Sequence, residues 1–422
     1  MEELRGIAYL RKKLAMHISR IEARYNQYDM KKEEQSVSIV IPTYMRKLYI
    51  ATLGWCTKAV DSLADRLSVK EFKDEDNLFE INKIFEMNNP DIFFDSAILN
   101  ALIASCSFVY ISEDEVGYPR LQVIEANNAT GIIDPITGLL KEGYAVLQRN
   151  DEGIPIVEAY FTPEYTRIIY GGKENEDEDD VFNHNVGYPL LVPIIHRPDA
   201  VRPFGRSRIT RSAEYYQKYA KNTFERAEIT AEFYSFPQKY ILGTSSNDDF
   251  NIDKWKATIS TLLVLSKDEE GDKPSVGQFT TSSMSPFTEQ LRTAAAGFAG
   301  ETGLTLDDLG FVSDNPSSSE AIKASHETLR TMAKKAQRCF TSGFRNVAFL
   351  AVCLRDKIGY RRDKFMKIKI KWEPVFETDL SSLGVIGDAS FKLNQAVDGF
   401  IDKEVIEELT GIRGANNGSW YF

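Results

Sequence analysis

Apolar residues recur at helical spacing in the first part of the chain. They predict an amphipathic helix that ends near Tyr25 and a second helix over residues 54–69. The apolar face of each predicted helix is made mostly of aliphatic side chains: Leu4, Ile7, Ala8, Leu14, Ile18 and Ile21 in the first, and Val60, Leu63 and Leu67 in the second.

Alternation of apolar and polar residues replaces this spacing after about Ser107. A further apolar helix, starting at Pro90, leads into it. The segments FVYIS, LQVIEA, GYAVLQR, IVEAYFT and TRIIYGG then alternate as strands do, with turn residues such as Asn127-Asn128 and Gly171-Gly172 between them. We therefore predict an α+β domain over residues 1–203.

A long helical pattern begins after Pro203. Residues 204–235 contain no proline, and no glycine after Gly205. At about 1.5 Å per residue, a helix of roughly 28 residues would span roughly 40 Å. Its apolar stripe is thin, so we expect it to need neighbours along its sides. The stripe consists of Tyr215, Tyr219, Phe224, Ala227 and Ala231.

The sequence of the C-terminal half predicts two more helices and a polar loop between them. A small β-containing segment over residues 236–284 is followed by a helix over 285–300 and a polar loop over 301–317. The S-x-x-E spacing of Ser317 and Glu320 is that of a capping box, so the next helix should start near Ser318.

That last helix should run to about Arg355, because apolar residues recur in it at intervals of three and four. Its interior Gly343 weakens one turn and leaves room for a bend. Lys364 to Trp372 alternate like an edge strand with its lysines toward solvent, and a helical tail is expected from about Asp388.

Composition narrows the class of protein. The chain has 422 residues, 43% hydrophobic and 27% charged, which is typical of folded soluble proteins. No apolar stretch reaches the ~20 residues that cross a bilayer, and the N-terminus lacks the apolar segment of a signal peptide. Four scattered cysteines in apolar surroundings predict buried thiols rather than disulfides: Cys56, Cys106, Cys339 and Cys353.

The formal net charge of −11 argues against a protein that grips nucleic acid tightly, since such proteins displace counterions with a basic patch. It is compatible with a protein past which DNA must slide. The acidic run from Glu174 to Asp180 supplies part of the excess, and we interpret it as a solvated loop between strands.

No phosphate-binding, nucleophile-elbow or zinc motif occurs in the sequence. Asp307 and Asp308 lack a third acid at a useful spacing, and the serines at 317–319 are explained by helix capping. We therefore predict neither a cofactor nor a metal site, and no catalytic residue. The four histidines stand alone and are interpreted as packing or surface residues: His17, His184, His196 and His326.

The organisation is more informative than any motif. The predicted long helices carry too many polar side chains to pack within one chain, and they flank a small β segment and a polar loop. This arrangement fits a chain that packs against copies of itself in a ring. In their order and spacing, five segments then resemble the portal (head–tail connector) proteins of tailed bacteriophages, of the siphophage type. They cover roughly Leu53 to Ile412, and the most specific runs from VPIIHRPDAVRPFGRSRIT to EFYSFPQKYILG.

The other four are GWCTKAVDSLADRL, the segment from IFEMNNPDIFF to SEDEVGYP, the segment from VGQFTTSSMSPF to GLTLDDLGF, and NPSSSEAIKASHETL. One departure is the turn after the second long helix, where the family often has Gly-Ile-Pro and this chain has Gly303-Leu304-Thr305-Leu306.

The resemblance implies a portal fold with a β-containing wing, long stem and crown-side helices and a small α/β clip. It assigns residues 1–203 to the wing, 204–235 and 285–300 to two stem helices, 236–284 to the clip, and 301–317 to a tunnel loop. It further assigns 318–360 to a long wing or crown-side helix, 361–387 to a strand returning to the wing, and 388–422 to the crown.

The same resemblance implies roles for individual residues. The tunnel loop would face DNA with Thr305, Asp307, Asp308, Ser313, Asp314, Asn315 and Ser317, the stem would carry Lys218, Lys221 and Arg226, and the clip would dock partners through Lys239, Tyr240, Trp255 and Lys267. Acids and small polar groups in the loop would let a polyanion pass without holding it.

The implied protein is a non-enzymatic ring, a dodecamer, at one capsid vertex of the virion, assembled in the host cytoplasm. Its partners would be double-stranded DNA, terminase, head-completion or adaptor proteins, and capsid and scaffolding proteins, with no membrane. The alternatives are a metal-dependent enzyme that processes nucleic acid and a monomeric structural adaptor.

Overall fold

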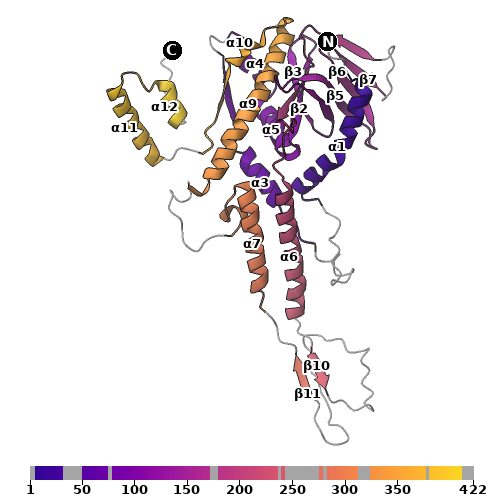
Figure 1. Ribbon diagram of the computed structural model, residues 1–422, viewed down its shortest axis with the longest axis vertical. Helices are drawn as coiled ribbons and strands as arrows, with labels where there is room; N and C mark the ends of the chain where they lie inside the picture. Colours follow the sequence, from indigo (N-terminus) through magenta and orange to yellow (C-terminus); the bar gives the residue numbers. More distant parts are fainter. Residues whose placement is uncertain are drawn as a thin grey trace, which may run out of the picture.

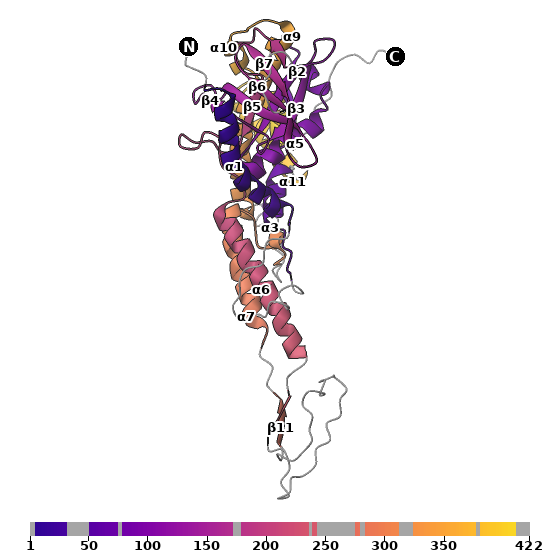
Figure 2. The same cartoon turned by 90° about the vertical axis from the view of Figure 1, so that its right-hand side faces the viewer.

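The structure is a computed structural model, and it describes residues 5–31, 50–74, 78–171, 179–235, 239–242, 275–278, 283–311, 324–376 and 380–410. A body of strands and helices occupies one end of the molecule, and two helices extend from it side by side as a stalk (Figure 1). A two-stranded hairpin lies beyond the stalk (Figure 2). The predicted α+β class is confirmed.

Two antiparallel sheets form the β part of the body. The smaller has β2 (Cys106–Glu113) between β3 (Pro119–Glu125) and β9 (Leu191–Ile195). The larger has five strands in chain order: β4 (Ala129–Ile133), β5 (Leu140–Arg149), β6 (Pro155–Phe161), β7 (Tyr165–Tyr170) and β8 (Asp180–Asn183). Alternation predicted five of these strands, namely β2, β3, β5, β6 and β7, and did not predict β4, β8 or β9.

Helices cover the sheets and build most of the core. The predicted N-terminal helices are present as α1 (Ile7–Tyr28), α3 (Trp55–Ala64) and α5 (Pro90–Ala104), together with the short α4 (Ile81–Glu86). A third pairing joins β1 (Val69–Lys73) to β12 (Lys369–Trp372), so the C-terminal part returns to the body.

Two buried carboxylates hold α1 on the five-stranded sheet. Glu142 accepts the backbone N–H groups of Arg5 and Gly6 at 2.9 and 3.1 Å, where α1 begins. Glu158 pairs with the guanidinium of Arg11. Because a buried charge is stable only when it is paired and hydrogen-bonded, these contacts fix where α1 lies.

Helix α9 (Glu327–Asp356) runs through the body, and every residue from Asn346 to Leu354 is buried. The prediction that all the long helices are too polar-sided to pack within one chain is therefore wrong for α9. Gly343 serves packing here: a Cβ on it would lie 2.8 Å from Ile194 Cδ1 and 3.4 Å from the Pro193 carbonyl oxygen. Glycine lets α9 approach β9.

The stalk consists of α6 (Arg211–Ser235) and α7 (Ser285–Thr302). Helix α6 starts seven residues later than position 204, because Gly205 has φ 75° and the segment after it bonds to the end of α5. Helix α7 runs two residues past position 300. The hairpin beyond them pairs β10 (Lys239–Leu242) with β11 (Ser275–Gln278).

The C-terminal region differs from its predicted boundaries. Residues from Lys364 were expected to form one strand, but the structure has α10 (Arg362–Met366) and only then β12. The buried Phe365 stacks on Phe79 at 4.3 Å between ring centroids, which favours the helical turn. The tail helices are α11 (Leu380–Ala396), which starts before Asp388, and α12 (Lys403–Thr410).

All four cysteines are free; Cys56, Cys106 and Cys353 are buried as predicted, and Cys339 is half-buried. Burial raises the pKa of the Cys106 thiol to about 12, which makes it unreactive. Within the described ranges we find no helix with the length and hydropathy of a membrane span.

Candidate functional site: the stalk and its junction with the body

Small residues let the two stalk helices pack closely. Ala213 and Ala220 of α6 and Ala294 and Ala295 of α7 are buried. At Gly297, a Cβ would lie 2.4 Å from the ring of Tyr216, so only glycine fits this crossing. The helices lie side by side in both views (Figures 1 and 2).

The outer side of α6 carries a basic and aromatic stripe. Arg211, Lys218 and Arg226 are exposed and stand about two turns apart, so they share one face with Tyr215, which is 64% exposed. Of the predicted stem cations, the structure thus brings Lys218 and Arg226 together. Lys221 is half-buried and lies on the adjoining, acidic face with Glu214, Glu225 and Glu228.

Near the body, the outer side of α7 is made of small residues, whereas the exposed side chains of Glu289 and Arg292 lie farther along the helix. Thr293, Ala296 and Gly300 are exposed at helical spacing, and a Cβ on Gly300 would have nothing within 4 Å. One stalk helix therefore presents bulky cationic and aromatic side chains, and the other presents a flat face.

Arg208 joins the stalk to the body from a buried position. Its guanidinium donates to the carbonyl oxygen of Thr302 at the end of α7, to that of Ala59 on α3 at 3.3 Å, and to the sulfur of Met332 on α9 at 3.1 Å. Burial lowers its pKa to about 10, so it stays charged at neutral pH. A cation at a helix C-terminus is favoured by the helix dipole.

The turn before Arg208 is equally constrained. A Cβ on Gly205 would lie 2.1 Å from the carbonyl oxygen of His196. His196 is buried against Phe340, and its Nδ1 lies 2.7 Å from the Arg206 carbonyl oxygen. Burial lowers the pKa of His196 to about 3, so the ring is neutral and Nδ1 donates.

Sequence reasoning did not single out Arg208 or Thr302, whereas His196 had been interpreted as a packing or surface residue and is a packing residue. The available signal was the glycine at 205 directly before Ser207-Arg208, where a positive φ commonly marks a close approach of two backbone segments. Sequence spacing does not show which buried arginine lies at the C-terminus of which helix, because that depends on the tertiary structure.

The first part of the predicted tunnel loop is folded. Thr305 N and Oγ1 donate to the carboxylate of Asp308 at 2.8 and 2.9 Å, and Asp308 N donates back to Thr305 Oγ1 at 3.1 Å. This reciprocal pair opens a short 3₁₀ helix, η3 (Asp307–Leu309). Leu306, Leu309 and Phe311 pack against the core, and Asp307 is exposed.

The remaining predicted residues are divided between the hairpin and the parts outside the described residues. Lys239 and Tyr240 lie on β10, opposite Gln278 and Gly277 of β11. Ser313, Asp314, Asn315, Ser317, Trp255 and Lys267 lie outside the described residues, as do the capping box at Ser317–Glu320 and the first part of the acidic run.

The two described residues of the acidic run form an ion pair and a hydrogen bond with neighbouring side chains. Asp179 pairs with Arg167 at 2.7 Å, and Asp180 accepts the hydroxyl of Tyr170 at 2.8 Å. Among the described residues no group of three or more His, Cys, Asp or Glu side chains could hold a metal ion.

Comparison with known proteins gives concordant results. The profile of the family described as "Phage portal protein, SPP1 Gp6-like" matches residues 7–387. The portal protein of Mycobacterium phage L5 is 27% identical over 365 residues, covering 80% of this chain and 72% of that protein. The portal protein of Mycobacterium phage D29 is 25% identical over 402 residues, covering 91% and 81%.

Among solved structures, a chain of the virion of a native gene transfer agent particle aligns with a TM-score of 0.47 and 13% identity, over 94% of this chain and 100% of that one. A chain from the neck of the native particle, computed with C12 symmetry, gives 0.45 and 14%, over the same shares. The family match covers nearly the whole body, the stalk and β12, and so this chain belongs to the SPP1 Gp6-like phage portal proteins.

Proposed function

We propose that this protein forms a dodecameric ring at one vertex of the capsid and that double-stranded DNA passes through the ring during packaging and ejection. Membership of the portal family makes it a structural component of a phage-like virion. The observation that carries the finer proposal is the stalk: two helices that project from a well-packed body and leave their outer sides uncovered.

The two outer sides of the stalk are suited to each other. Side-by-side association would place the bulky stripe of α6, with Tyr215 and Lys218, against the flat face of α7 around Gly300 in the next copy. Such an interface uses two different patches, so repetition of it leads to a closed ring when the rotation closes. It would also give α6 the lateral neighbours that its thin apolar stripe requires.

The segments then take the roles that the family resemblance implies. Residues 1–203 and 361–387 are the wing, α6 and α7 the stem, 236–284 the clip, and 388–422 the crown, with α9 in residues 318–360 joining wing and crown. Residues 301–317 are the tunnel loop. Since Thr305 and Asp308 bond to each other, Asp307 is the described loop residue most available to the passage.

Partners follow from the same arrangement. The clip, with Lys239, Tyr240, Trp255 and Lys267, is the docking site for terminase and for head-completion or adaptor proteins, and capsid and scaffolding proteins contact the wing in the host cytoplasm during assembly. The ring itself hydrolyses nothing: terminase supplies the work of packaging, and Asp307, Asp308 and Asp314 repel the DNA phosphates rather than hold them.

The mass and shape of the particles that the purified protein forms decide between the ring and its alternatives. We expect mass photometry and negative-stain electron microscopy to show a ring of about a dozen copies with a central hole, for the protein alone or made together with its own capsid and scaffolding proteins. A protein that stays monomeric under both conditions contradicts the ring and favours the adaptor. Hydrolysis of DNA with magnesium or manganese would favour the enzyme.

A further inference from the structure

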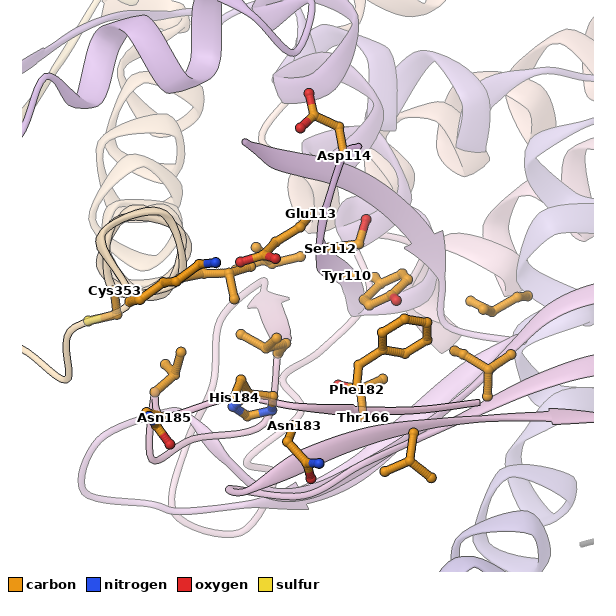
Figure 3. A pocket seen from close by; sticks show the side chains of 18 of the residues that line it. Tyr110, Ser112, Glu113, Asp114, Thr166, Phe182, Asn183, His184, Asn185 and Cys353 are labelled. Atoms are coloured by element: carbon orange, nitrogen blue, oxygen red, sulfur yellow. The ribbon is translucent and has the colours of Figure 1, made fainter. Parts of the chain in front are cut away.

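A cavity of about 940 Å³ opens between the two sheets of the body, far from the stalk. Tyr110 and Ser112 of β2 line one side, Thr166 and Phe182 of β7 and β8 the other, and the end of α9 with Cys353 closes it (Figure 3). The lining combines apolar side chains with several polar and charged groups.

Two polar side chains in this cavity have no hydrogen-bond partner among the described residues. Thr166 is 2% exposed, yet its hydroxyl makes no hydrogen bond. Both ring nitrogens of His184 are buried and unpartnered, and burial lowers the pKa of this histidine, so its ring is neutral with one donor and one acceptor. An unpartnered buried polar group costs about 1–3 kcal/mol, and an occupant could remove that cost.

Strand β8 forms one lip of the cavity and is an open edge. It is the last strand of its sheet, no described strand pairs with its outer side, and all four of its residues are exposed. The N–H of His184 points inward to Glu164, so by the alternation of an antiparallel ladder the N–H groups of Val181 and Asn183 point outward.

An added strand would continue this pattern. Its alternate side chains would fall on the same face as Thr166 and Phe182, which stand opposite each other in the sheet, and so would enter the cavity. Phe182 and Val181 are 57% and 51% exposed and would both be covered.

Charge at the mouth is mostly negative. Glu113 lines the mouth, and Asp180, which accepts the hydroxyl of Tyr170, lies beside it on β8, against the ammonium group of Lys357. The carboxylate of Asp114 accepts the N–H groups of Val116 and Tyr118 and points away from the cavity (Figure 3). These are the charged groups that the described elements place there. A segment with basic residues flanking its apolar ones is complementary to that charge.

This chain's own described basic strand does not fit. Strand β12 alternates lysine with apolar residues, but Ile368 and Ile370 beside its lysines are buried in the core of the body and Lys371 pairs with Glu71. A second copy would have to unfold its own body to insert that strand.

We propose that this cavity and the β8 edge, together the wing groove, bind an extended segment of a different protein that alternates apolar and polar residues and carries lysine or arginine. The segment adds to β8 as a sixth strand and places its apolar side chains in the cavity, against Phe182. The wing groove is thus a peptide site separate from the stalk and the hairpin.

The test uses the full-length protein and two labelled synthetic peptides, one alternating lysine and valine and the other glutamate and valine. Fluorescence anisotropy should show binding of the lysine peptide and none of the glutamate peptide. Val181→Pro removes an outward N–H and should abolish binding. Glu113→Lys should weaken it by about fivefold at low salt, and Asp398→Lys, at an exposed site between α11 and α12, should leave it unchanged.

Hydrogen exchange gives a second readout that does not depend on any variant's folding. The lysine peptide should protect the amides of Val181 and Asn183 and leave those of the stalk unchanged. Equal binding of both peptides, or protection elsewhere, overturns the proposal. A photo-crosslinker placed at Phe182 in assembled particles that links only to another copy of this chain would overturn it as well.

Discussion

Three single glycine residues allow backbone segments of this protein to approach each other closely. Gly205, Gly297 and Gly343 each lie where a Cβ would meet another segment at under 3 Å, and each joins parts far apart in the sequence. Their sequence context reads as a turn in the first case and a weak helical turn in the others. The reason for each glycine lies in its neighbour, which spacing alone does not reveal.

Gly297→Ala should destabilise the stalk, because its Cβ would meet the ring of Tyr216 at 2.4 Å. Overpacking of this kind costs about 1–3 kcal/mol. Chemical unfolding measures the loss, and Gly300→Ala is the matched control on the same helix. That site is open, so alanine should stabilise α7 by about 0.5–1 kcal/mol. Equal effects of the two changes would contradict the packing described at Gly297.

His196 makes stability depend on pH. Its pKa is about 3 when folded, whereas free histidine titrates near ~6.5. Between these values the unfolded chain binds a proton that the folded chain does not, so stability is lost as pH falls below about 6.5, by up to about 1.4 kcal/mol per unit.

The difference between wild type and His196→Asn isolates this effect, because asparagine keeps an N–H for the Arg206 carbonyl oxygen and does not titrate. Urea unfolding at about pH 7 and about pH 5 should show a smaller loss on acidification in the variant. Parallel losses in both proteins would mean that His196 is protonated in the folded state.

At the scale of elements, the type and order of most helices and strands could be predicted, because periodicity within one element is local information. The sequence did not predict which neighbouring elements bury each helix or strand. The residues of α9 from Asn346 to Leu354 are buried on all sides, and only the fold supplies the β9 and β2 neighbours that bury them. The start of α6 was placed too early for a similar reason: the Ser207 hydroxyl donates to the carbonyl oxygen of Ile103 at 2.5 Å and the Arg208 N–H donates to that of Leu102 at 2.7 Å, so this segment is held by the end of α5.

The candidate site divides in the same way. The cations on α6 were found from the sequence, but which of them share a face needed the observed helix register, and Arg208 was found only from its contacts. The capping pair of Thr305 and Asp308 has the spacing of a helix start, yet the polar character of the loop concealed it.

Gly300→Phe tests the stalk interface at this scale. The site is open in a single chain, so folding should be unaffected and the melting temperature should stay the same or rise. In a ring, a phenyl group would separate α7 from the neighbouring α6, so assembly should fall by about tenfold or more in mass photometry. Val116→Phe, at a turn residue that is 91% exposed, is the control. Normal rings from Gly300→Phe would exclude this face as the contact.

The whole molecule is a self-sufficient body with a dependent stalk. One core cluster is built around α5 and α9 and extends into the stalk, where it includes Ala213, Ala294 and Phe298. The stalk is anchored to the body through Arg208, through Gln217, which accepts the N–H of Cys56 at 2.7 Å, and through the contact of Phe298 with Trp55 at 5.4 Å between ring centroids. Association between copies is therefore expected to affect the stalk far more than the body.

Charge at this scale predicts weak affinity for DNA. With a net charge of −11, the protein should give no mobility shift of linear duplex DNA at micromolar concentration and about 0.15 M salt. Any weak binding at low salt should disappear steeply as salt rises. Tight binding at physiological salt would contradict a passage through which DNA slides.

The antiparallel course of the two stalk helices has a consequence for how such chains can diversify. Because α6 ends and α7 begins at the same extremity, the chain leaves and re-enters the stalk at adjacent points. Insertions and exchanges are tolerated where the ends of a segment meet far from a packed core. Recombination at these two points would exchange the segment beyond the stalk and leave the body and the stalk as they were inherited.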